Sequence, residues 1–388
     1  MGDAAAGVGD RLREVRKRRG MTQRDLARQS RVSLSLVRKV EQGDHARVGA
    51  VALRKLAVAL DVPVTALLSA APEPRPAPSG GEMWQPLAVA LAEPPADGGA
   101  PGEAGLASAL ASATRLYHAN EYATLAVLLP GLVRDASHAA PVLRSRVLQL
   151  AGSALTQARQ RDAARVALDR SYADAEAAGS VLDAASAVIT QAWLMLGERR
   201  FDDVRLTAAA WADRIEPKLS SATRAEVSAW GWLLLRASAA AIRDNRPDEA
   251  ADFMRLAEAA AVACGPEKGS YHQYFTTFGP ATVAMKKVEN AVIDGRPGLA
   301  LSLAAAVPPG LRPTSDNRNR HLLDMTAAYL DLRRYAAASD VLQRLSVQAP
   351  AWLATQPTAA GLMSQIIARR RLLTPQMREL AEVMRLPV

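Results

Sequence analysis

The sequence predicts an all-α fold in two parts joined by a linker, and three observations lead to this prediction. Apolar residues recur at three- and four-residue spacing through most of the chain, and no strand-like alternation is present. Proline and glycine concentrate between residues 71 and 105. Residues 1–70 hold 14 Lys+Arg against 7 Asp+Glu, whereas the other 318 residues hold 34 against 32. The first part therefore carries most of the net charge of +9, as expected of a domain that meets phosphate groups.

The N-terminal part begins with a short lead over residues 1–8, after which residues 10–19 are expected to form a first helix. Leu12 and Val15 lie three residues apart and are expected to point inward, with the arginines outward. The basic run at 16–19 lies in this helical pattern and not beside an apolar anchor, which favours nucleic acid over a membrane surface as its partner.

Residues 22–43 predict two short helices separated by a tight turn. Leu26 and Ala27 belong to the first helical pattern, and Val37 and Val40, three residues apart, belong to the second. Between these patterns, residues 30–33 leave room only for a turn of three or four residues. Such a pair of helices with an apolar seam is a helix-turn-helix.

The ends of these two helices carry the expected capping residues. Thr22 and Ser33 each precede a helix-forming run by one residue, where a hydroxyl accepts from a free backbone N–H. Gly43 stands where a left-handed residue usually ends a helix. An apolar stripe over residues 48–60 predicts a fourth helix, residues 61–63 break it, and residues 64–68 are expected to form a fifth.

The segment between residues 71 and 105 is expected to be a linker, because its proline- and glycine-rich stretches are unsuited to a packed core. Residues 83–94, MWQPLAVALAEP, are too apolar for a pure linker. They are expected to form a short segment that docks on one of the domains.

Residues 106–388 are alanine-rich and helical by pattern, and turn signals interrupt them at 118–120, 178–179, 197–198, 244–245, 294–295 and 331–332. Similar short runs with a basic residue follow several of the turns, and the arginines in them, at 200, 246, 296 and 334, are 46, 50 and 38 residues apart. An irregular helix-turn-helix repeat of this kind predicts an α-solenoid of tetratricopeptide type. The alternative is an irregular all-helical bundle.

The stretch at residues 22–43 resembles the helix-turn-helix of the Xre/Cro/phage-repressor family, and the resemblance extends from about Gly9 to Leu68. It rests on Thr-Gln at 22–23, the Leu-Ala pair, the Val-Ser that begins the second helix, and the run Val-Glu-Gln-Gly at 40–43. The resemblance implies a five-helix DNA-binding domain over residues 9–70, whose recognition helix enters the major groove of double-stranded DNA. It also implies a homodimer on an inverted repeat.

Carried over residue by residue, the resemblance assigns roles within this domain. The base-facing candidates are Leu34, Ser35, Arg38 and Lys39. The candidates for phosphate contacts are Gln23, Ser33, Gln42 and Arg47. Arg16 is expected to pair with Glu41 and so hold the first helix against the third.

Two positions depart from the family pattern. The turn usually carries glycine where this chain has Arg31, so either Arg31 takes a left-handed conformation or the turn differs. Leu34 and Leu36 replace residues that are commonly polar; Leu34 is suited to thymine methyl groups, and Leu36 to packing.

The second part resembles the carboxy-terminal region of a group of actinobacterial Xre-type regulators with tetratricopeptide-like repeats. The resemblance rests mainly on residues 271–301, YHQYFTTFGPATVAMKKVENAVIDGRPGLAL, and on residues 320–338, RHLLDMTAAYLDLRRYAAA. We expect the repeat domain over residues 106–388 to sense a ligand or partner. Because the first part is basic and this domain is near neutral, we also expect the repeats to carry the dimer interface.

Aromatic residues mark the most promising ligand-binding surface of this second part. The chain is only 4% aromatic, yet residues 271–278 hold four such rings and a histidine, and a helix with polar residues follows. Rings beside a few polar groups suit a small-molecule or peptide pocket, although a packed corner between repeats is the alternative. The candidates are Tyr271, Tyr274, Phe275, Phe278 and Asn290. Four tryptophans are expected either to pack between helices or to line a groove, namely Trp193, Trp211, Trp230 and Trp232.

No motif for catalysis or metal binding is present, so we expect no enzyme, no metal and no cofactor. The five histidines are scattered, and one cysteine, Cys264, excludes an intrachain disulfide. The chain lacks a signal-peptide pattern and an apolar run long enough to span a membrane, which predicts a cytoplasmic, nucleoid-associated protein.

Two functions fit these expectations. The first is a sequence-specific transcriptional regulator whose repeat domain responds to a bound ligand or peptide. The alternative is an adaptor whose repeat domain grips another protein while the helix-turn-helix places it on DNA. A small enclosed pocket favours the first function, and a long open groove favours the second.

Overall fold

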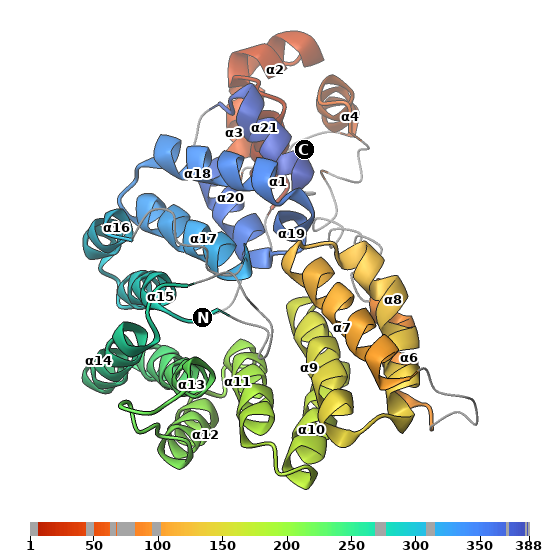
Figure 1. Ribbon diagram of the computed structural model, residues 1–388. Coiled ribbons are helices and arrows are strands. Elements are labelled where there is room, and N and C mark those ends of the chain that lie inside the picture. The colour runs from red at the N-terminus through yellow and green to blue at the C-terminus, as the bar shows by residue number, and fades with distance from the viewer. Residues whose placement is uncertain are drawn as a thin grey trace. The chain divides into compact units, whose positions relative to one another are not determined.

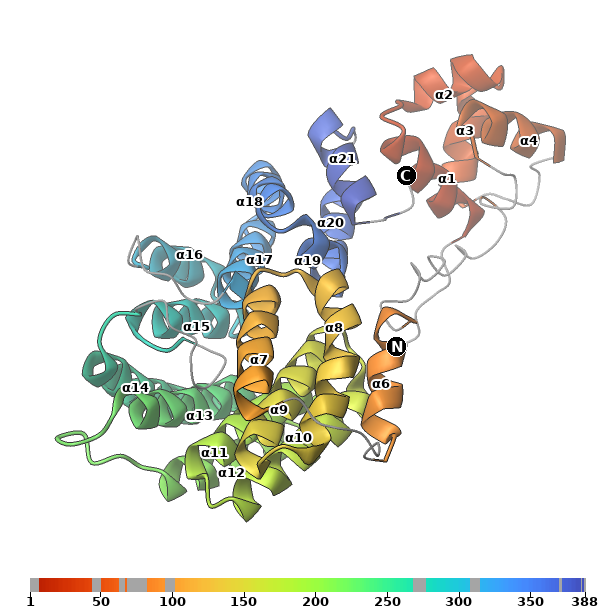
Figure 2. The same cartoon turned by 45° about the vertical axis from the view of Figure 1, so that its right-hand side comes forward.

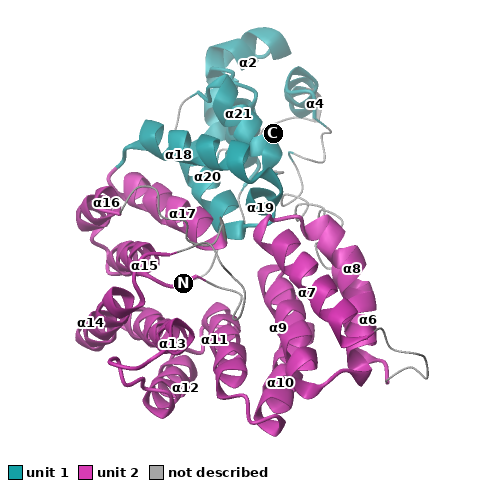
Figure 3. Cartoon of the chain, viewed as in Figure 1, with its two compact units in different colours: residues 1–77, 333–388 teal, residues 78–332 magenta. Residues whose placement is uncertain are grey.

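The computed structural model describes residues 7–43, 50–62, 67, 82–94, 102–267, 277–307, 315–369, 372–384 and 386. Every regular element within these residues is a helix, which confirms the prediction of an all-α fold with a helix-turn-helix followed by a helical-repeat region (Figure 1). The chain divides into two compact units (Figure 3). Unit 1 contains residues 1–77 and 333–388, and unit 2 contains residues 78–332. The region expected to be one repeat domain, residues 106–388, is thus shared between the two units.

The N-terminal helices of unit 1 pack around a small apolar core. They are α1 (Val8–Arg18), α2 (Gln23–Ser30), α3 (Leu34–Glu41) and α4 (Ala50–Ala59). Leu12, Leu26, Val37, Val40 and Leu56 are fully buried in this core, as their helical spacing predicts. The expectation that the arginines of α1 point outward is wrong for Arg11, Arg16 and Arg18, which are buried because each hydrogen-bonds within the domain. The expected fifth helix at 64–68 falls outside the described residues, apart from the buried Leu67.

The C-terminal helices of unit 1 form a second cluster of apolar side chains. They are α18 (Tyr335–Gln348), α19 (Pro350–Ala354), α20 (Pro357–Arg369) and α21 (Pro375–Val383). Trp352, Met363 and Ile366 are fully buried among them. The Nζ atom of Lys17 on α1 donates to the carbonyl oxygen of Ala368 on α20 at 3.0 Å, so the two groups of helices touch within unit 1.

Unit 2 opens with a short apolar segment where the sequence predicts one that docks. It consists of a 3-10 turn, η1 (Glu82–Trp84), and α6 (Gln85–Ala92). Trp84, Leu87 and Leu91 are buried. Arg170 Nη1 also donates to the carbonyl oxygen of Leu91 at 2.7 Å. The segment packs along α8 of the repeat region (Figure 2).

Helices of unit 2 then follow one another as antiparallel neighbours. They are α7 (Glu103–His118), α8 (Tyr122–Asp135), η2 (Ala136–His138), α9 (Pro141–Gln157), α10 (Arg161–Ala177), α11 (Val181–Gly197), α12 (Phe201–Arg214), α13 (Arg224–Arg243), α14 (Pro247–Cys264), α15 (Pro280–Ile293), α16 (Pro297–Ala305) and α17 (Ser315–Asp331). Small residues bring some of these helices close together. A Cβ atom added at Gly152 of α9 would lie only 2.5 Å from the side chain of Leu168 on α10, so only glycine fits there.

One turn geometry recurs through the described part of unit 2. After each of six helices, a residue takes the left-handed conformation with φ between 59° and 68°. The next residue donates its backbone N–H to the carbonyl oxygen five residues earlier, at 2.8 to 3.1 Å. This is the Schellman pattern, which satisfies carbonyl groups that a helix end leaves free. The left-handed residues are Asn120, Arg159, Gly179, Arg199, Asn245 and Gly295.

Candidate nucleic-acid interface

The exposed face of α3 presents a row of polar and basic side chains. Val37 and Val40 on the opposite face are fully buried, and this fixes which side of the helix meets solvent. Ser35, Arg38 and Lys39 are exposed. They lie three and four residues apart, which places them on one face of the helix. Three of the four predicted base-facing residues are therefore gathered on the surface that the core leaves free.

Leu34 and Leu36 differ from these three residues, because both are only partly exposed. Each packs at the edge of the apolar core of the N-terminal helices. Leu36 thus lies where the sequence predicts a packing role. Leu34 keeps part of its side chain accessible at the first turn of α3, beside Ser35.

The beginnings of α2 and α3 are capped as predicted. Thr22 Oγ1 accepts from the backbone N–H of Asp25 at 3.1 Å, and the Asp25 carboxylate accepts from the backbone N–H of Thr22 at 3.0 Å. The Thr22 hydroxyl also donates to the Asp25 carboxylate at 2.6 Å, and this bond, with the one from the Thr22 N–H, lowers the pKa of Asp25 because both favour its charged form. Ser33 Oγ accepts from the N–H of Leu36 at 3.2 Å.

Arg31 occupies the turn between α2 and α3 in the left-handed conformation, with φ 54° and ψ 38°. Arg31 therefore takes the left-handed conformation that glycine usually supplies at this position, and the turn itself does not differ. Val32 donates its N–H to the carbonyl oxygen of Ala27 at 3.2 Å, which closes the same Schellman pattern that recurs in unit 2.

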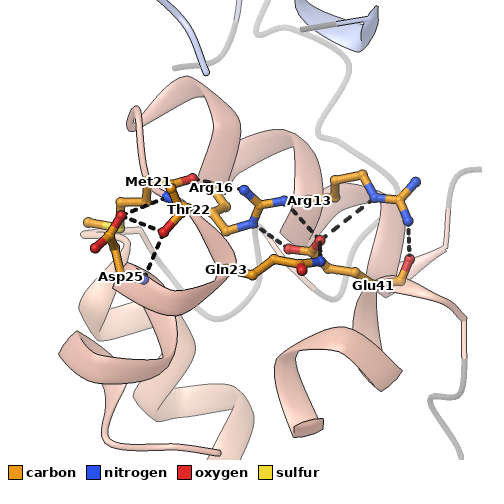
Figure 4. Close-up of polar contacts among 7 residues, drawn as sticks. All are labelled: Arg13, Arg16, Met21, Thr22, Gln23, Asp25 and Glu41. Atoms are coloured by element: carbon orange, nitrogen blue, oxygen red, sulfur yellow. Dashed lines mark hydrogen bonds and ion pairs between the residues drawn. The ribbon is translucent and has the colours of Figure 1, made fainter. Parts of the chain in front are cut away.

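Glu41, at the last turn of α3, anchors this helix to the other two (Figure 4). Arg16 Nε lies 2.5 Å from Glu41 Oε1, and Arg16 Nη2 lies 2.9 Å from Oε2. Gln23 Nε2 donates to Oε2 at 2.8 Å, and Arg13 Nη2 donates to the backbone carbonyl of Glu41 at 2.7 Å. Glu41 is only 2% exposed. The carboxylate thus holds α1, α2 and α3 in one fixed arrangement.

The predicted phosphate-contact residues are placed differently from one another. Gln42 is exposed next to the basic face of α3. Gln23 is partly exposed and uses one of its two amide hydrogens for Glu41. The hydroxyl of Ser33 serves as the cap of α3 and also lies 3.0 Å from Ser35 Oγ. Arg47 falls outside the described residues.

Further exposed arginines flank this face, and sequence reasoning did not select them as contacts. Arg24, Arg28 and Arg31 are exposed on α2 and in the turn. Arg28 is paired with the Asp25 carboxylate at 2.7 Å. The signal that identifies them is the helical spacing of basic residues between the core positions of α2. Arg13 was also missed, and its contact with the Glu41 carbonyl explains its place on α1.

The predicted ligand-binding residues are only partly described. Tyr271, Tyr274 and Phe275 lie outside the described residues. Phe278 is 3% exposed and belongs to the core of unit 2, where its ring packs directly over Gly231 of α13. Asn290 Nδ2 donates to Ser238 Oγ at 2.8 Å.

A cavity of about 230 Å³ lies elsewhere in unit 2, and neither Phe278 nor Asn290 lines it. Residues of α7, α9, α11, α13, α15 and α17 line the cavity, including Trp193 and Trp232. Trp232 also belongs to the core of unit 2, together with Trp230, and Trp211 packs at the edge of that core. The four tryptophans therefore divide between the two roles that the sequence allows.

The cavity contains more basic than acidic side chains. The basic residues in its lining are Arg236, Arg243, Lys286 and Arg320, and the acidic ones are Glu289 and Asp316. Glu289 lies 2.5 Å from Arg243 Nη2 and 2.6 Å from Lys286 Nζ. Although burial raises the pKa of Glu289, these two cations lower it by more, so Glu289 is ionised. His118 also lines the cavity, and burial lowers its pKa to about 4, so it is neutral at pH 7.

Two further features of the described residues bear on function. They contain no group of three or more His, Cys, Asp or Glu side chains that could hold a metal ion. None of the described helices has the length and apolar character needed to cross a membrane.

Comparisons with known proteins identify the N-terminal region. Searches of the curated proteins and of the solved structures gave no significant match. A family model described as a helix-turn-helix domain matches residues 8–70, which include the capped helices, the left-handed turn and the basic face described above. This chain therefore carries a helix-turn-helix domain at its N-terminus, which supports a DNA-binding regulator.

Proposed function

We propose that the protein is a sequence-specific transcriptional regulator of the Xre/Cro type, bound to DNA as a homodimer on an inverted repeat. A small molecule or peptide held by a tetratricopeptide-like region modulates its activity. In this proposal the chain resembles actinobacterial regulators, acts on DNA in the cytoplasm, and catalyses no reaction. The observation that carries it is the exposed, basic face of α3 opposite the buried Val37 and Val40.

The side chains on the exposed face of α3 support the assignment of this helix to the major groove. Arg38 and Lys39 are long enough to reach base edges from a helix in the groove, and Ser35 is one turn closer to the beginning of the helix. Arg24 and Arg31 are also exposed, on α2 and in the turn before α3, and in this proposal they contact phosphate groups. Gln42 lies at the end of the same face.

A homodimer follows from the small size of the reading surface. A single recognition helix contacts few base pairs, and proteins with this motif gain affinity by placing two such helices about 34 Å apart. The operator would then be an inverted repeat, because the symmetry of the site mirrors that of the dimer.

The cavity in unit 2 favours small-ligand sensing over the adaptor function. A cavity of about 230 Å³ is smaller than most drug-sized pockets and far smaller than a protein-binding groove. Its lining combines tryptophans with a few polar and charged groups, as small-molecule sites do.

The test of DNA recognition is selection of binding sites from a random double-stranded library by the full-length protein. The expected product is an inverted repeat that binds two protomers, with affinity that falls at least about 100-fold when one half-site is scrambled. Fluorescence anisotropy gives the affinity, and sedimentation velocity gives the stoichiometry. Recovery of no preferred sequence would overturn the proposal of specific regulation, and one protomer on one half-site would overturn the dimer.

A further inference from the structure

The cavity of unit 2 holds two arginines that have no carboxylate partner among the residues that the structure describes. Within the described residues, no Asp or Glu oxygen lies within 4.0 Å of the guanidinium of Arg236 or of Arg320. Arg236 Nε donates to the carbonyl oxygen of Ile189 at 3.2 Å, and Arg320 Nη2 donates to Gln157 Oε1 at 2.9 Å. Most of the N–H groups of both side chains are thus available to another acceptor.

The neighbouring cations in the same cavity are paired with a carboxylate, unlike the two arginines. Arg243 and Lys286 share Glu289. Asp316, the other acidic residue of the lining, accepts from Tyr122 Oη at 3.2 Å. Burial raises the pKa of Asp316, and this weakens its ability to compensate the nearby Arg320. The cavity therefore retains an excess of positive charge.

Tryptophan rings hold both guanidinium groups in place. The Cζ atom of Arg236 lies 5.1 Å from the ring centroid of Trp232 and 6.0 Å from that of Trp193. The Cζ atom of Arg320 lies 5.2 Å from the ring centroid of Trp193. Trp193 thus lies next to both arginines. Cation–π contacts of this kind stabilise a guanidinium without using its N–H donors.

Partial burial adds a reason for Arg236 to bind an anion. Desolvation lowers the pKa of Arg236 to about 10, although the charge of Glu289 raises it, and the group remains charged at neutral pH. A guanidinium that has lost part of its hydration gains from a directly bound anion, and a planar carboxylate matches its fork of N–H donors. Ser153, Ser186 and Thr190 contribute hydroxyl groups to the same lining.

We propose that this cavity binds a small aromatic carboxylate, whose carboxylate group pairs with Arg236 and Arg320 while its ring lies against Trp193 and Trp232. An apolar cavity of about 150 Å³ accommodates benzene, so about 230 Å³ holds roughly ten non-hydrogen atoms. This size excludes peptides longer than a dipeptide of small residues. The inference rests on the proposed function, because it specifies the effector of the same regulator.

Titration calorimetry of the full-length protein with benzoate and phenylacetate, each beside its neutral amide, tests the inference. Each acid and its amide have nearly the same shape, so the comparison isolates the charge. We expect at least one acid to bind about tenfold or more tightly than its amide, since hydrogen bonds to a charged group are worth about that much. Equal binding of acid and amide, or no binding of either acid at millimolar concentration, would overturn the inference without any variant.

Three variants then locate the site. Arg236→Gln and Arg320→Gln should each weaken acid binding about tenfold or more while leaving amide binding nearly unchanged. Arg214→Gln is the matched control, because the Arg214 guanidinium also lies over a tryptophan, at 4.3 Å from the Trp211 ring centroid, but outside the cavity lining. Unchanged acid binding in both cavity variants, or an equal loss in the control, would show that the acid binds elsewhere and would overturn the assignment.

Two additional measurements separate this inference from the proposed function. Inorganic phosphate should bind more weakly than the acids, and equal binding would reduce the site to a general anion site. DNA binding of the same preparation is measured by anisotropy on the selected site. Acid binding without specific DNA binding would overturn the proposed regulator and keep the carboxylate site. Specific DNA binding without preference for the acids over their amides would keep the regulator and overturn the carboxylate site.

Discussion

Arg16 and Glu41 form a bidentate ion pair in the interior of the helix-turn-helix, with nitrogen–oxygen distances of 2.5 and 2.9 Å. Both side chains are buried. The pair joins α1 to the last turn of α3, so the position of the DNA-reading face depends on a charge interaction as well as on apolar packing.

Replacing only one partner of this ion pair should destabilise the domain strongly. Arg16→Met leaves the Glu41 carboxylate buried with only Gln23 and the more distant Arg13 as polar neighbours, and we expect a loss of about 2–4 kcal/mol. The combined change Arg16→Met with Glu41→Leu removes both charges and should cost less than Arg16→Met alone. Urea unfolding of the wild type, of Arg16→Met, of Glu41→Leu and of the double variant measures these differences. Losses that simply add would show that the two residues do not depend on each other.

Arg38 should contribute to sequence preference. Arg38→Ala is expected to cost about 1–3 kcal/mol on the preferred site and to relax selection at one or two base pairs. Arg28→Ala is the matched control, because Arg28 is an exposed arginine already paired with Asp25. Binding to the selected site and to single-base variants of it provides the measurement. An equal loss on every sequence would reassign Arg38 to a phosphate contact.

Arg31→Gly should stabilise the helix-turn-helix. A left-handed conformation costs a residue with a Cβ atom about 1 kcal/mol or more, and glycine avoids that cost. Arg28→Gly, inside α2, should instead destabilise by about 1 kcal/mol. Hydrogen exchange of the backbone amides in residues 23–43 reports both effects locally. Slower exchange in the first variant and faster exchange in the second are expected, and the opposite order would contradict the role assigned to the turn.

Acid should destabilise unit 2 partly through His321. Burial, aided by the charge of Lys286, lowers the pKa of His321 to about 4, whereas an unfolded histidine has a pKa near 6.5. Between these values the unfolded chain binds a proton that the folded chain does not, so stability is complete above pH 6.5 and falls as the pH drops towards 4.

His321→Gln should reduce this acid-induced loss by up to about 3 kcal/mol, since one pH unit of pKa difference corresponds to about 1.4 kcal/mol. Urea unfolding followed by tryptophan fluorescence at pH 7 and pH 4.5 gives the comparison. His118, whose pKa is also about 4, contributes in the same pH range, so the variant should retain part of the pH dependence. If the free energy of unfolding falls by the same amount between pH 7 and pH 4.5 in the variant and in the wild type, His321 does not contribute to the acid-induced loss of stability.

Helical periodicity and capping residues predicted much of the N-terminal domain. Leu26, Val37 and Val40 could be assigned to the core because their spacing leaves only one face to bury. The caps at Thr22 and Ser33 were predictable for a similar reason, since short hydroxyl side chains at helix starts have few other roles. The contact of Gln23 with Glu41 was not predictable, because the spacing of residues along a helix does not show which partner an amide side chain will bind.

Turn positions in unit 2 show where sequence reasoning loses precision. Asn120, Asn245 and Gly295 are residue types that favour the left-handed conformation, and turns were expected at these positions. Arg159 and Arg199 take the same conformation without such a preference. The turn at Arg159 was therefore missed, and the turn expected at 197–198 lies at Arg199. Packing of the flanking helices imposes these turns against local preference.

The cavity could not be predicted from sequence, because its walls come from six helices spread over some 200 residues. The tryptophans at 193 and 232 were candidates for a groove, but nothing in the sequence distinguishes Arg236 and Arg320 from the other arginines. Only the folded arrangement shows that no acidic group pairs with them within the described residues.

Gly231 and Phe278 interlock in a way that concerns the whole of α13. A Cβ atom at position 231 would lie 2.1 Å from the Phe278 ring, so the ring occupies the space that any side chain at 231 would need. The next residue, Trp232, faces the cavity, and its Nε1 donates to the carbonyl oxygen of Thr277 at 3.2 Å. The segment that leads into α15 therefore contacts α13 at two consecutive positions, Gly231 and Trp232. Rotation or sliding of α13 would break the Trp232 hydrogen bond and push the backbone at position 231 against the Phe278 ring. These two contacts therefore hold this wall of the cavity in place.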